Sequence, residues 1–231
     1  MSDVKEPRVV HVDDWRKAWS EGRNKWHLDH VHPHLEKHVD VAVNGKANAK
    51  VLFPFCGKTY DMKWLADKGH EVVGIEGSEV AAKQFGEDHH LQYNVLPIEG
   101  TSIKLYKYVE ANVRIYVGDV WEFNRSIECN FDTVWDRGGF TIINIDDRKK
   151  YIPLIASLMA PHARYMLVID SYDRNVIHGP PHSVEKEGVD EIFGETFDIK
   201  YVDKKDSLKP LQKSWGLTFF DETLYQLTLK L

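Results

Sequence analysis

The chain alternates short apolar runs with amphipathic stretches, a pattern that is typical of a parallel sheet whose strands are joined by helices. Residues 50–54 and 71–76 are two such apolar runs. The stretch between them places Met62 and Leu65 on one helical face and stops at Gly69, a residue type that often follows a helix. We therefore predict a strand, a helix and a second strand parallel to the first.

The same alternation continues toward the C-terminus. The remaining elements are expected as a helix over 79–88, a short strand near 92–96, a hairpin made by 102–108 and 113–118, a strand at 131–135, a helix from Asp146 or Asp147 with a kink or late start at Pro153, a strand over 164–169, a helix near 184–193, and strands at 196–202 and 217–229. No helix fits between the last two strands, so they are predicted to pair antiparallel.

These elements predict an α/β fold in one Rossmann-like domain over residues 1–231. We expect a mostly parallel seven-stranded sheet with an antiparallel C-terminal strand and an inserted hairpin. The sheet core is expected over 50–231, and a helical lid over about 10–40.

The expected lid is rich in tryptophan. Trp15 and Trp19 are one turn apart on a helix that Asp13 or Asp14 can cap, and Trp26 follows them. These aromatic side chains can either pack the segment onto the core or close over a ligand, where an indole face can also attract a cation.

Candidate chemistry lies where the first two predicted strands end. A small-residue turn at Cys56, Gly57 and Lys58 follows the first strand, and Thr59 can cap the next helix. Glu76 ends the second strand. Gly57 lets backbone approach a ligand, and the Glu76 carboxylate can accept hydrogen bonds from both ribose hydroxyls, as in nucleoside-binding α/β sheets.

Two cofactor classes fit such a sheet, NAD(P) and S-adenosyl-L-methionine. The turn after the first strand lacks the GxGxxG glycines that let a pyrophosphate rest on a helix N-terminus. Asp119 offers a second acid that can accept from an adenine amino group, and the C-terminal antiparallel hairpin suits a methyltransferase sheet better. These features together favour the methyl donor.

Composition limits the compartments and partners that fit the protein. The chain has 231 residues, a formal charge of −6, 42% hydrophobic and 29% charged residues, and two distant cysteines. Such a globule is expected to be cytoplasmic and monomeric, without a nucleic-acid partner or a membrane span. Five histidines between His27 and His38 invite a metal interpretation, but Pro33 interrupts their spacing and no cysteine or paired acid completes a ligand set, so we expect no metal.

Several blocks of the sequence form a recognisable set, namely Phe53-Pro-Phe-Cys-Gly-Lys58, Val72-Val-Gly-Ile-Glu76, Trp135-Asp-Arg-Gly138, Ser171-Tyr-Asp173, Gly179-Pro-Pro181 and Lys213-Ser-Trp-Gly216. In these blocks, and from about Trp15 to the C-terminus, the chain resembles the thiopurine S-methyltransferase family. The resemblance implies a cytosolic enzyme that moves a methyl group from S-adenosyl-L-methionine to the sulfur of an aromatic or heterocyclic thiol and releases S-adenosyl-L-homocysteine.

The resemblance also implies roles for individual residues. On the donor side it points to Trp15, Trp19, Phe55, Glu76, Asp119, Val120 and Arg137, which join Gly57 of the turn as candidate cofactor-binding residues. On the acceptor side it points to Trp26 and Arg137, and Lys213 is a further candidate because it lies near the position of a family arginine that this chain lacks. Arg137 is the candidate catalytic residue, because it ends a predicted strand, where it can stabilise an anionic acceptor.

One departure from the family pattern bears on the acceptor. A second acceptor-side arginine is expected four residues before Trp215, but Leu211 stands there. Methylation of other soft nucleophiles, such as small thiols, selenium species or halide, therefore stays open. Two hypotheses from different classes stay open beside it, a non-catalytic cofactor-binding module and an NAD(P) enzyme.

Overall fold

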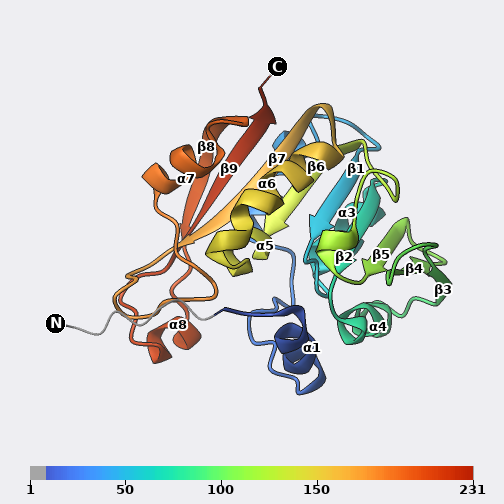
Figure 1. Ribbon diagram of the computed structural model, residues 1–231, viewed down its shortest axis with the longest axis horizontal. Helices are drawn as coiled ribbons and strands as arrows, with labels where there is room; N and C mark the ends of the chain where they lie inside the picture. Colours follow the sequence, from blue (N-terminus) through green and yellow to red (C-terminus); the bar gives the residue numbers. More distant parts are fainter. Residues whose placement is uncertain (1–8, 231) are drawn as a thin grey trace.

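The computed structural model describes residues 9–230, and in these residues the strands form a single mixed sheet of nine strands (Figure 1). The strands are β1 (Lys50–Pro54), β2 (Glu71–Glu76), β3 (Tyr93–Pro97), β4 (Lys104–Tyr108), β5 (Val113–Val117), β6 (Phe131–Arg137), β7 (Met159–Ser171), β8 (Phe197–Asp206) and β9 (Asp221–Leu229). Their order across the sheet is β3-β4-β5-β2-β1-β6-β7-β9-β8.

The centre of the sheet is parallel and both sides of it are antiparallel. β5, β2, β1, β6 and β7 run in one direction. β9 pairs antiparallel with both β7 and β8, as expected for the C-terminal strand. The strand predicted near 92–96 and the first arm of the predicted hairpin join the sheet as β3 and β4, so it has nine strands rather than the expected seven. β4 pairs antiparallel with β5, and β3 pairs antiparallel with β4.

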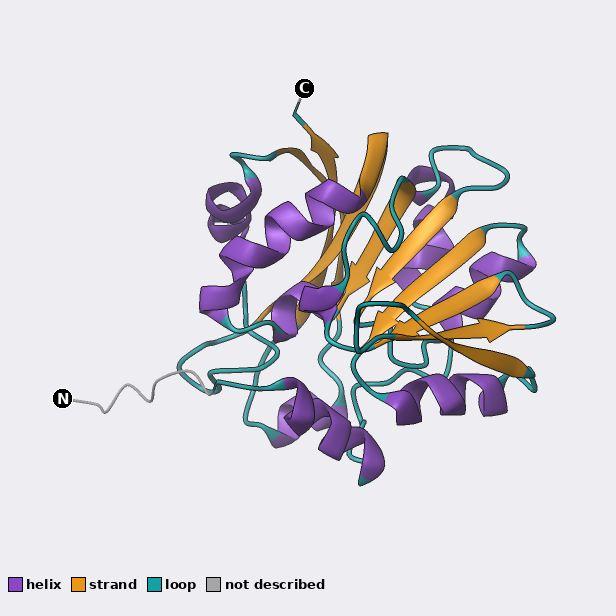
Figure 2. Cartoon of the chain, turned by 45° about the vertical axis from the view of Figure 1, so that its right-hand side comes forward, coloured by secondary structure: helices purple, strands orange, loops and turns teal. Residues whose placement is uncertain are grey.

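Helices cover both faces of this sheet (Figure 2). The α-helices are α1 (Val12–Ser20), α2 (Pro33–Ala42), α3 (Tyr60–Asp67), α4 (Glu79–Asp88), α5 (Gly139–Ile142), α6 (Arg148–Leu158), α7 (Lys186–Phe193) and α8 (Pro210–Ser214), and short 3₁₀ turns occupy Val120–Glu122 and Ile145–Asp147. Apolar side chains of α2, α3 and α4 pack against one face of the sheet. Those of α5, α6 and α7 pack against the other.

Several helix boundaries differ in instructive ways from the sequence prediction. α1 starts after His11, whose backbone N–H donates to Asp14 at 2.9 Å, so Asp13 and Asp14 lie in the first turn rather than at the cap. α6 begins at Arg148 and continues through Pro153. The short helix α8 lies between β8 and β9, where no helix was expected.

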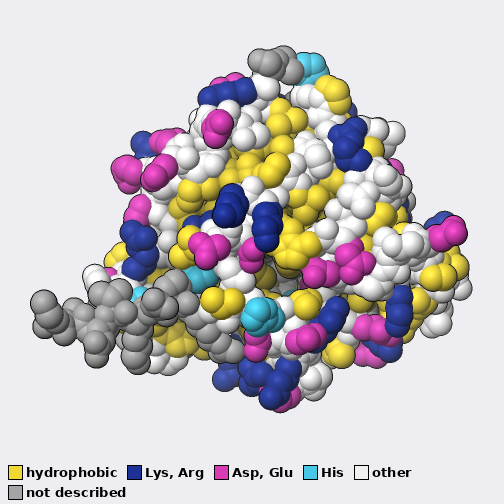
Figure 3. Space-filling model, in the orientation of Figure 1, with side chains coloured by type: hydrophobic (Ala, Val, Ile, Leu, Met, Phe, Trp, Pro, Cys, Tyr) yellow, Lys and Arg dark blue, Asp and Glu magenta, His cyan; other side chains and the backbone are white. Residues whose placement is uncertain are grey.

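The carboxyl ends of the parallel strands lie at the same end of the sheet. α1 and α8 both lie beyond this end, on the lower side of Figure 1. Lys, Arg, Asp and Glu side chains are interspersed over the face shown in Figure 3. No helix within residues 9–230 combines the length and apolar character that a bilayer crossing requires.

Two glycines give a matched test of the packing. A Cβ on Gly74 in β2 would lie 2.5 Å from the sulfur of Cys56, which is buried, whereas a Cβ on Gly188 in α7 would meet only Val184, at 3.5 Å. We expect Gly74→Ala to lower the free energy of unfolding by about 1–3 kcal/mol. Gly188→Ala should raise it by about 0.4–1 kcal/mol. Denaturant unfolding of both variants checks this, and equal stability of the two would contradict the packing described.

Candidate active site

A cavity of about 660 Å³ lies at the carboxyl ends of the parallel strands. Residues at the ends of β1, β2, β6 and β7 line it, together with residues of α1, of α8 and of the turn after β5. Nine of the residues singled out from the sequence are brought together here, namely Trp15, Trp19, Trp26, Phe55, Gly57, Glu76, Asp119, Val120 and Arg137.

The turn after β1 has an unusual backbone. Gly57 has a φ of 53°, and a Cβ at this position would lie 3.1 Å from the ring of Trp19, so both the backbone conformation and the close approach favour glycine. Phe55 has a φ of 50°, which is uncommon for a residue with a side chain. No local pattern indicates this conformation of Phe55, because aromatic and other bulky residues rarely adopt it.

Glu76 closes the same turn from the neighbouring strand. Its carboxylate is buried and accepts hydrogen bonds from the backbone N–H of Gly57 at 2.8 Å and of Ser78 at 2.7 Å. Burial raises the pKa of Glu76, and the two backbone donors oppose that shift. Each carboxylate oxygen keeps a lone pair that can accept from a ligand hydroxyl.

Asp119 and Val120 follow β5 and lie beside this turn in the cavity wall. The Asp119 carboxylate accepts from the backbone N–H of Trp121 at 3.0 Å and so caps the 3₁₀ turn that begins at Val120. Val120 is buried. The pair therefore presents a polar acceptor next to an apolar surface, which suits the edge and face of a heterocycle.

Three tryptophans gather over the cavity. Trp26 packs edge-on against Trp15 and Trp19, with ring centroids 5.5 and 6.1 Å apart. Trp19 is buried, and Trp26 is 41% exposed. Their segment is fastened to the body of the protein, because Arg16 donates to the carbonyl of Gly77 at 2.9 Å.

A second anchor holds the start of the same segment. The side-chain amide of Asn144 accepts from the backbone N–H of Val10 at 2.9 Å and donates to the carbonyl of Val10 at 3.0 Å. With Arg16, this pair positions α1 across the cavity.

Arg137 reaches the cavity from the end of β6. It donates to the carbonyl of Trp26 at 3.2 Å and to the carboxylate of Glu222 at 3.4 Å. Its neighbour Asp136 points to the other side of the strand and is buried, where it accepts from the hydroxyls of Tyr151 and Tyr165, both at 2.7 Å. Alternation along the strand therefore separates the two charges, and Asp136 is not the partner of Arg137.

Glu222 and its neighbours were not identified from the sequence. Glu222 is buried at the start of β9, and its Oε2 accepts from the hydroxyl of Ser207 at 2.5 Å. The Nε2 of His32 lies 3.4 Å from the same oxygen. The Nδ1 of His32 accepts from the backbone N–H of His34 at 3.2 Å, so Nε2 carries the hydrogen that faces Glu222.

Asp61 supports the same floor of the cavity. Its carboxylate is buried and accepts from the backbone N–H of His32 at 2.7 Å and from the indole N–H of Trp135 at 3.1 Å. Lys58 pairs with Asp88 at 2.8 Å and not with Asp61. The only sequence signal for these acids was their position beside predicted strand or helix ends, which many surface acids share.

Two acids near Arg137 are shifted in opposite directions. Burial, then the charge of Glu222, raises the pKa of Asp170 to about 7. Burial also opposes ionisation of Glu222, but His32 and Arg137 outweigh it and hold the pKa of Glu222 well below its usual range.

Lys213 does not belong to this constellation. It is exposed on α8 and does not line the cavity, whereas Leu211, Gln212 and Trp215 do. The helical repeat explains the difference, because residue 213 lies about 200° around the axis from residue 211. The lysine of this segment that lines the cavity is Lys209, at the start of the helix.

The sequence is similar to known proteins along nearly its whole length. The profile of the family described as thiopurine S-methyltransferase (TPMT) matches residues 10–230. The chain is 38% identical over 226 residues to the probable thiopurine S-methyltransferase of Danio rerio, covering 96% of this chain and 97% of that one. It is 36% identical over 230 residues to the thiopurine S-methyltransferase of Equus caballus, covering 99% and 94%.

A solved structure shares the fold. The 1,6-didemethyltoxoflavin-N1-methyltransferase of Burkholderia thailandensis, with bound 1,6-didemethyltoxoflavin and S-adenosylhomocysteine, matches with a TM-score of 0.61 and 16% identity, over 99% of this chain and 98% of that chain.

The raised pKa of Asp170 predicts that the stability of the protein depends on pH. Because its pKa is raised to about 7 in the folded protein, its contribution to stability is full below pH ~4 and is lost as the pH rises through about 7. Asp170→Asn should therefore flatten the fall of stability over that range, by up to about 1.4 kcal/mol per pH unit. Denaturant midpoints measured across the range check this. The exposed Glu110→Gln serves as the control, and an unchanged slope in Asp170→Asn would contradict the assignment.

Proposed function

Because the chain belongs to the thiopurine S-methyltransferase family, we propose that it transfers the methyl group of S-adenosyl-L-methionine to the sulfur of an aromatic or heterocyclic thiol such as a thiopurine. The proposal rests on one observation. Glu76 and Asp119, the two acids suited to binding a nucleoside, line the same cavity as Arg137. The chain is thus an enzyme with a donor half and an acceptor half in the same cavity.

The donor half comprises the ends of β1, β2 and β5. The residues present fit S-adenosyl-L-methionine, since Glu76 has lone pairs for the ribose hydroxyls and Asp119 can accept from the adenine amino group beside Val120. Gly57, together with Phe55, lets the donor approach the backbone of the turn. Trp15 and Trp19 cover this half, and an indole face attracts the positive charge of a sulfonium.

The acceptor half lies between Trp26, Arg137 and the α8 segment. Arg137 is oriented by Glu222 and by the Trp26 carbonyl, and a guanidinium has five N–H donors, so it retains donors for an anionic heterocycle. Leu211 adds apolar surface where the family pattern has a second arginine, and Lys209 supplies a positive charge nearby. Lys213, which was expected on this side, is exposed on α8 and does not line the cavity.

The main contribution of the protein to the reaction is to position the donor and the acceptor. When bound, the donor supplies a methyl group already activated by its sulfonium. The acceptor thiol loses its proton to water, its sulfur lone pair forms the new carbon–sulfur bond, and the electrons of the broken bond remain on the donor sulfur. The chain aligns the two sulfurs. The tryptophans exclude water, and Arg137 stabilises the negative charge that the acceptor carries before transfer.

Methyl transfer to 6-mercaptopurine tests the proposal directly. With labelled S-adenosyl-L-methionine, we expect label on the thiopurine sulfur and none without acceptor. A simple aromatic thiol run in parallel measures how far Leu211 broadens the pocket. If the protein bound S-adenosyl-L-homocysteine saturably and yet labelled neither thiol nor selenide nor halide, it would be a non-catalytic binding module.

The role of Arg137 has its own test. Arg137→Ala should lower kcat/KM for the thiol by roughly ten- to a hundredfold, which corresponds to about 1.4–2.7 kcal/mol of lost transition-state stabilisation. Binding of S-adenosyl-L-homocysteine and thermal stability, measured alongside, separate this loss from damage to the Glu222 contact. Arg125→Ala, an exposed arginine that donates to the carbonyl of Ser157, is the matched control. Unchanged kinetics in Arg137→Ala would remove the proposed role.

A further inference from the structure

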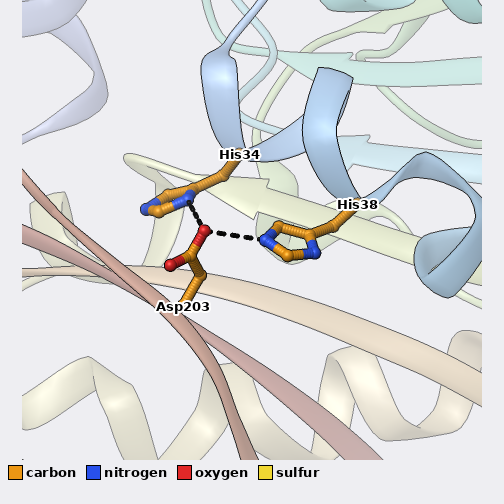
Figure 4. A group of neighbouring side chains, drawn as sticks. All are labelled: His34, His38 and Asp203. Carbon is orange, nitrogen blue, oxygen red and sulfur yellow. Dashed lines mark hydrogen bonds and ion pairs between the residues drawn. The ribbon is translucent and has the colours of Figure 1, made fainter.

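A second cluster of polar side chains lies outside the cavity, between α2 and β8 (Figure 4). His34 and His38 are one turn apart on α2, and Asp203 faces them from β8. One Oδ of Asp203 lies 2.8 Å from Nε2 of His38 and 3.7 Å from Nδ1 of His34. The three candidate ligand atoms all lie within 4.8 Å of one another.

The tautomer of His34 leaves a lone pair directed into this cluster. Nε2 of His34 lies 3.1 Å from the backbone carbonyl of Glu222. A carbonyl only accepts, so Nε2 carries the hydrogen and Nδ1 is the unprotonated nitrogen. His34 is only 2% exposed, and its Nδ1 faces the Asp203 oxygen at a separation too long for a hydrogen bond. Two acceptors that face each other beside the buried His34 ring accommodate a cation between them.

The hydrogen bond from Nε2 of His34 is also of the kind that metal-binding histidines make. A histidine that binds a metal through one ring nitrogen usually donates from the other to a carbonyl or carboxylate, which fixes the ring and its tautomer. The Glu222 carbonyl does this for His34.

The backbone is irregular at the other two residues of the cluster. His38 has φ −120° and ψ 23°, which is a non-helical conformation inside α2. β8 has a register shift between Tyr201 and Asp203, where the strand takes an extra residue relative to β9. A bulge of this kind changes the direction of a side chain. Both irregularities occur where the side chain points into the cluster.

Lys37 supplies a positive charge to the same carboxylate. Its Nζ lies 2.7 Å from the Asp203 oxygen, and its side chain is 65% exposed. An exposed ion pair of this kind contributes only about 0–1 kcal/mol. Lys37 can therefore swing into solvent when another cation takes its place.

We propose that His34, His38 and Asp203 bind a divalent transition-metal ion of the zinc class. Two imidazoles and one carboxylate are a donor set that such ions favour over Mg²⁺ or Ca²⁺. Ligand bonds of about 2.0–2.1 Å in a tetrahedron place neighbouring donor atoms roughly 3.3 Å apart, between the distances from the Asp203 oxygen to His38 and to His34. Three protein ligands leave a fourth position for water.

The ion would join the His-rich segment to the C-terminal hairpin. The sequence pattern predicts no metal because no single stretch contains a complete ligand set. Asp203 is 165 residues from His38 along the chain, so only the fold reveals it as the third ligand. The site is separate from methyl transfer, and its test does not depend on that activity.

Titration of the full chain, freed of metal by chelation and carrying no histidine tag, tests the site. Calorimetry with Zn²⁺ should give one ion per chain, and Co²⁺ should give the absorption of a low-symmetry four-coordinate site. His38→Gln and Asp203→Asn should each weaken binding at least about tenfold. Lys37→Met should tighten it, because a competing charge is removed. His30→Gln, which changes a nearby histidine outside the cluster, should leave it unchanged.

A second measurement guards against variants that simply unfold. Zn²⁺ should raise the melting temperature of the wild type but not of the His38→Gln/Asp203→Asn double variant, whose circular dichroism should match the wild type. The proposal fails if the wild type binds no stoichiometric Zn²⁺. It also fails if a folded double variant binds the ion as tightly as the wild type.

Discussion

The arrangement of the site depends on the contacts of one buried carboxylate, that of Glu222. It joins Arg137 from β6, His32 from the His-rich segment and Ser207 from the end of β8. A buried carboxylate is costly unless it is paired and hydrogen-bonded, and here Arg137 and Ser207 donate to it while Nε2 of His32 lies 3.4 Å away. Its backbone carbonyl also accepts from His34, so one residue orients both the cavity floor and the cluster behind it.

The side of β6 that faces away from the cavity supports the same geometry. Asp136 is held there by Tyr151, Tyr165 and the backbone N–H of Phe140. Because successive strand residues point to opposite faces, fixing Asp136 in the core also fixes the direction in which Arg137 leaves the strand. The orientation of the guanidinium is thus set from both sides of the sheet.

Local patterns were sufficient to predict most elements and much of the cavity. The strands 50–54 and 71–76 match β1 and β2, and the strand-end residues Gly57 and Glu76 lie together because parallel strands end at one edge. Long-range pairing could not be predicted in this way. The Glu222 contact with Arg137 spans 85 residues, and nothing in the local pattern of either segment indicates it. The segments of β3 and β4 were predicted as strands, and they extend the main sheet because β5 leaves an edge open to pairing.

The position of Lys213 and the backbone conformation of Phe55 could not be predicted from the sequence, each for a specific physical reason. The charge of Lys213 and its closeness in sequence to Trp215 suit an acceptor-side role, but the turn of α8 decides which side chains face inward. The positive φ of Phe55 depends on the surrounding packing, which overrides the local preference of an aromatic residue.

The position of β9 has a consequence for how the protein is made. The last strand of the chain is inserted between β7 and β8, and it carries Glu222. β8 comes before β9 in the sequence, yet it is the edge strand and pairs with β9, so its place in the sheet depends on a strand that is synthesised later. A chain lacking β9 can still form the turn after β1, but it lacks the carboxylate that orients Arg137.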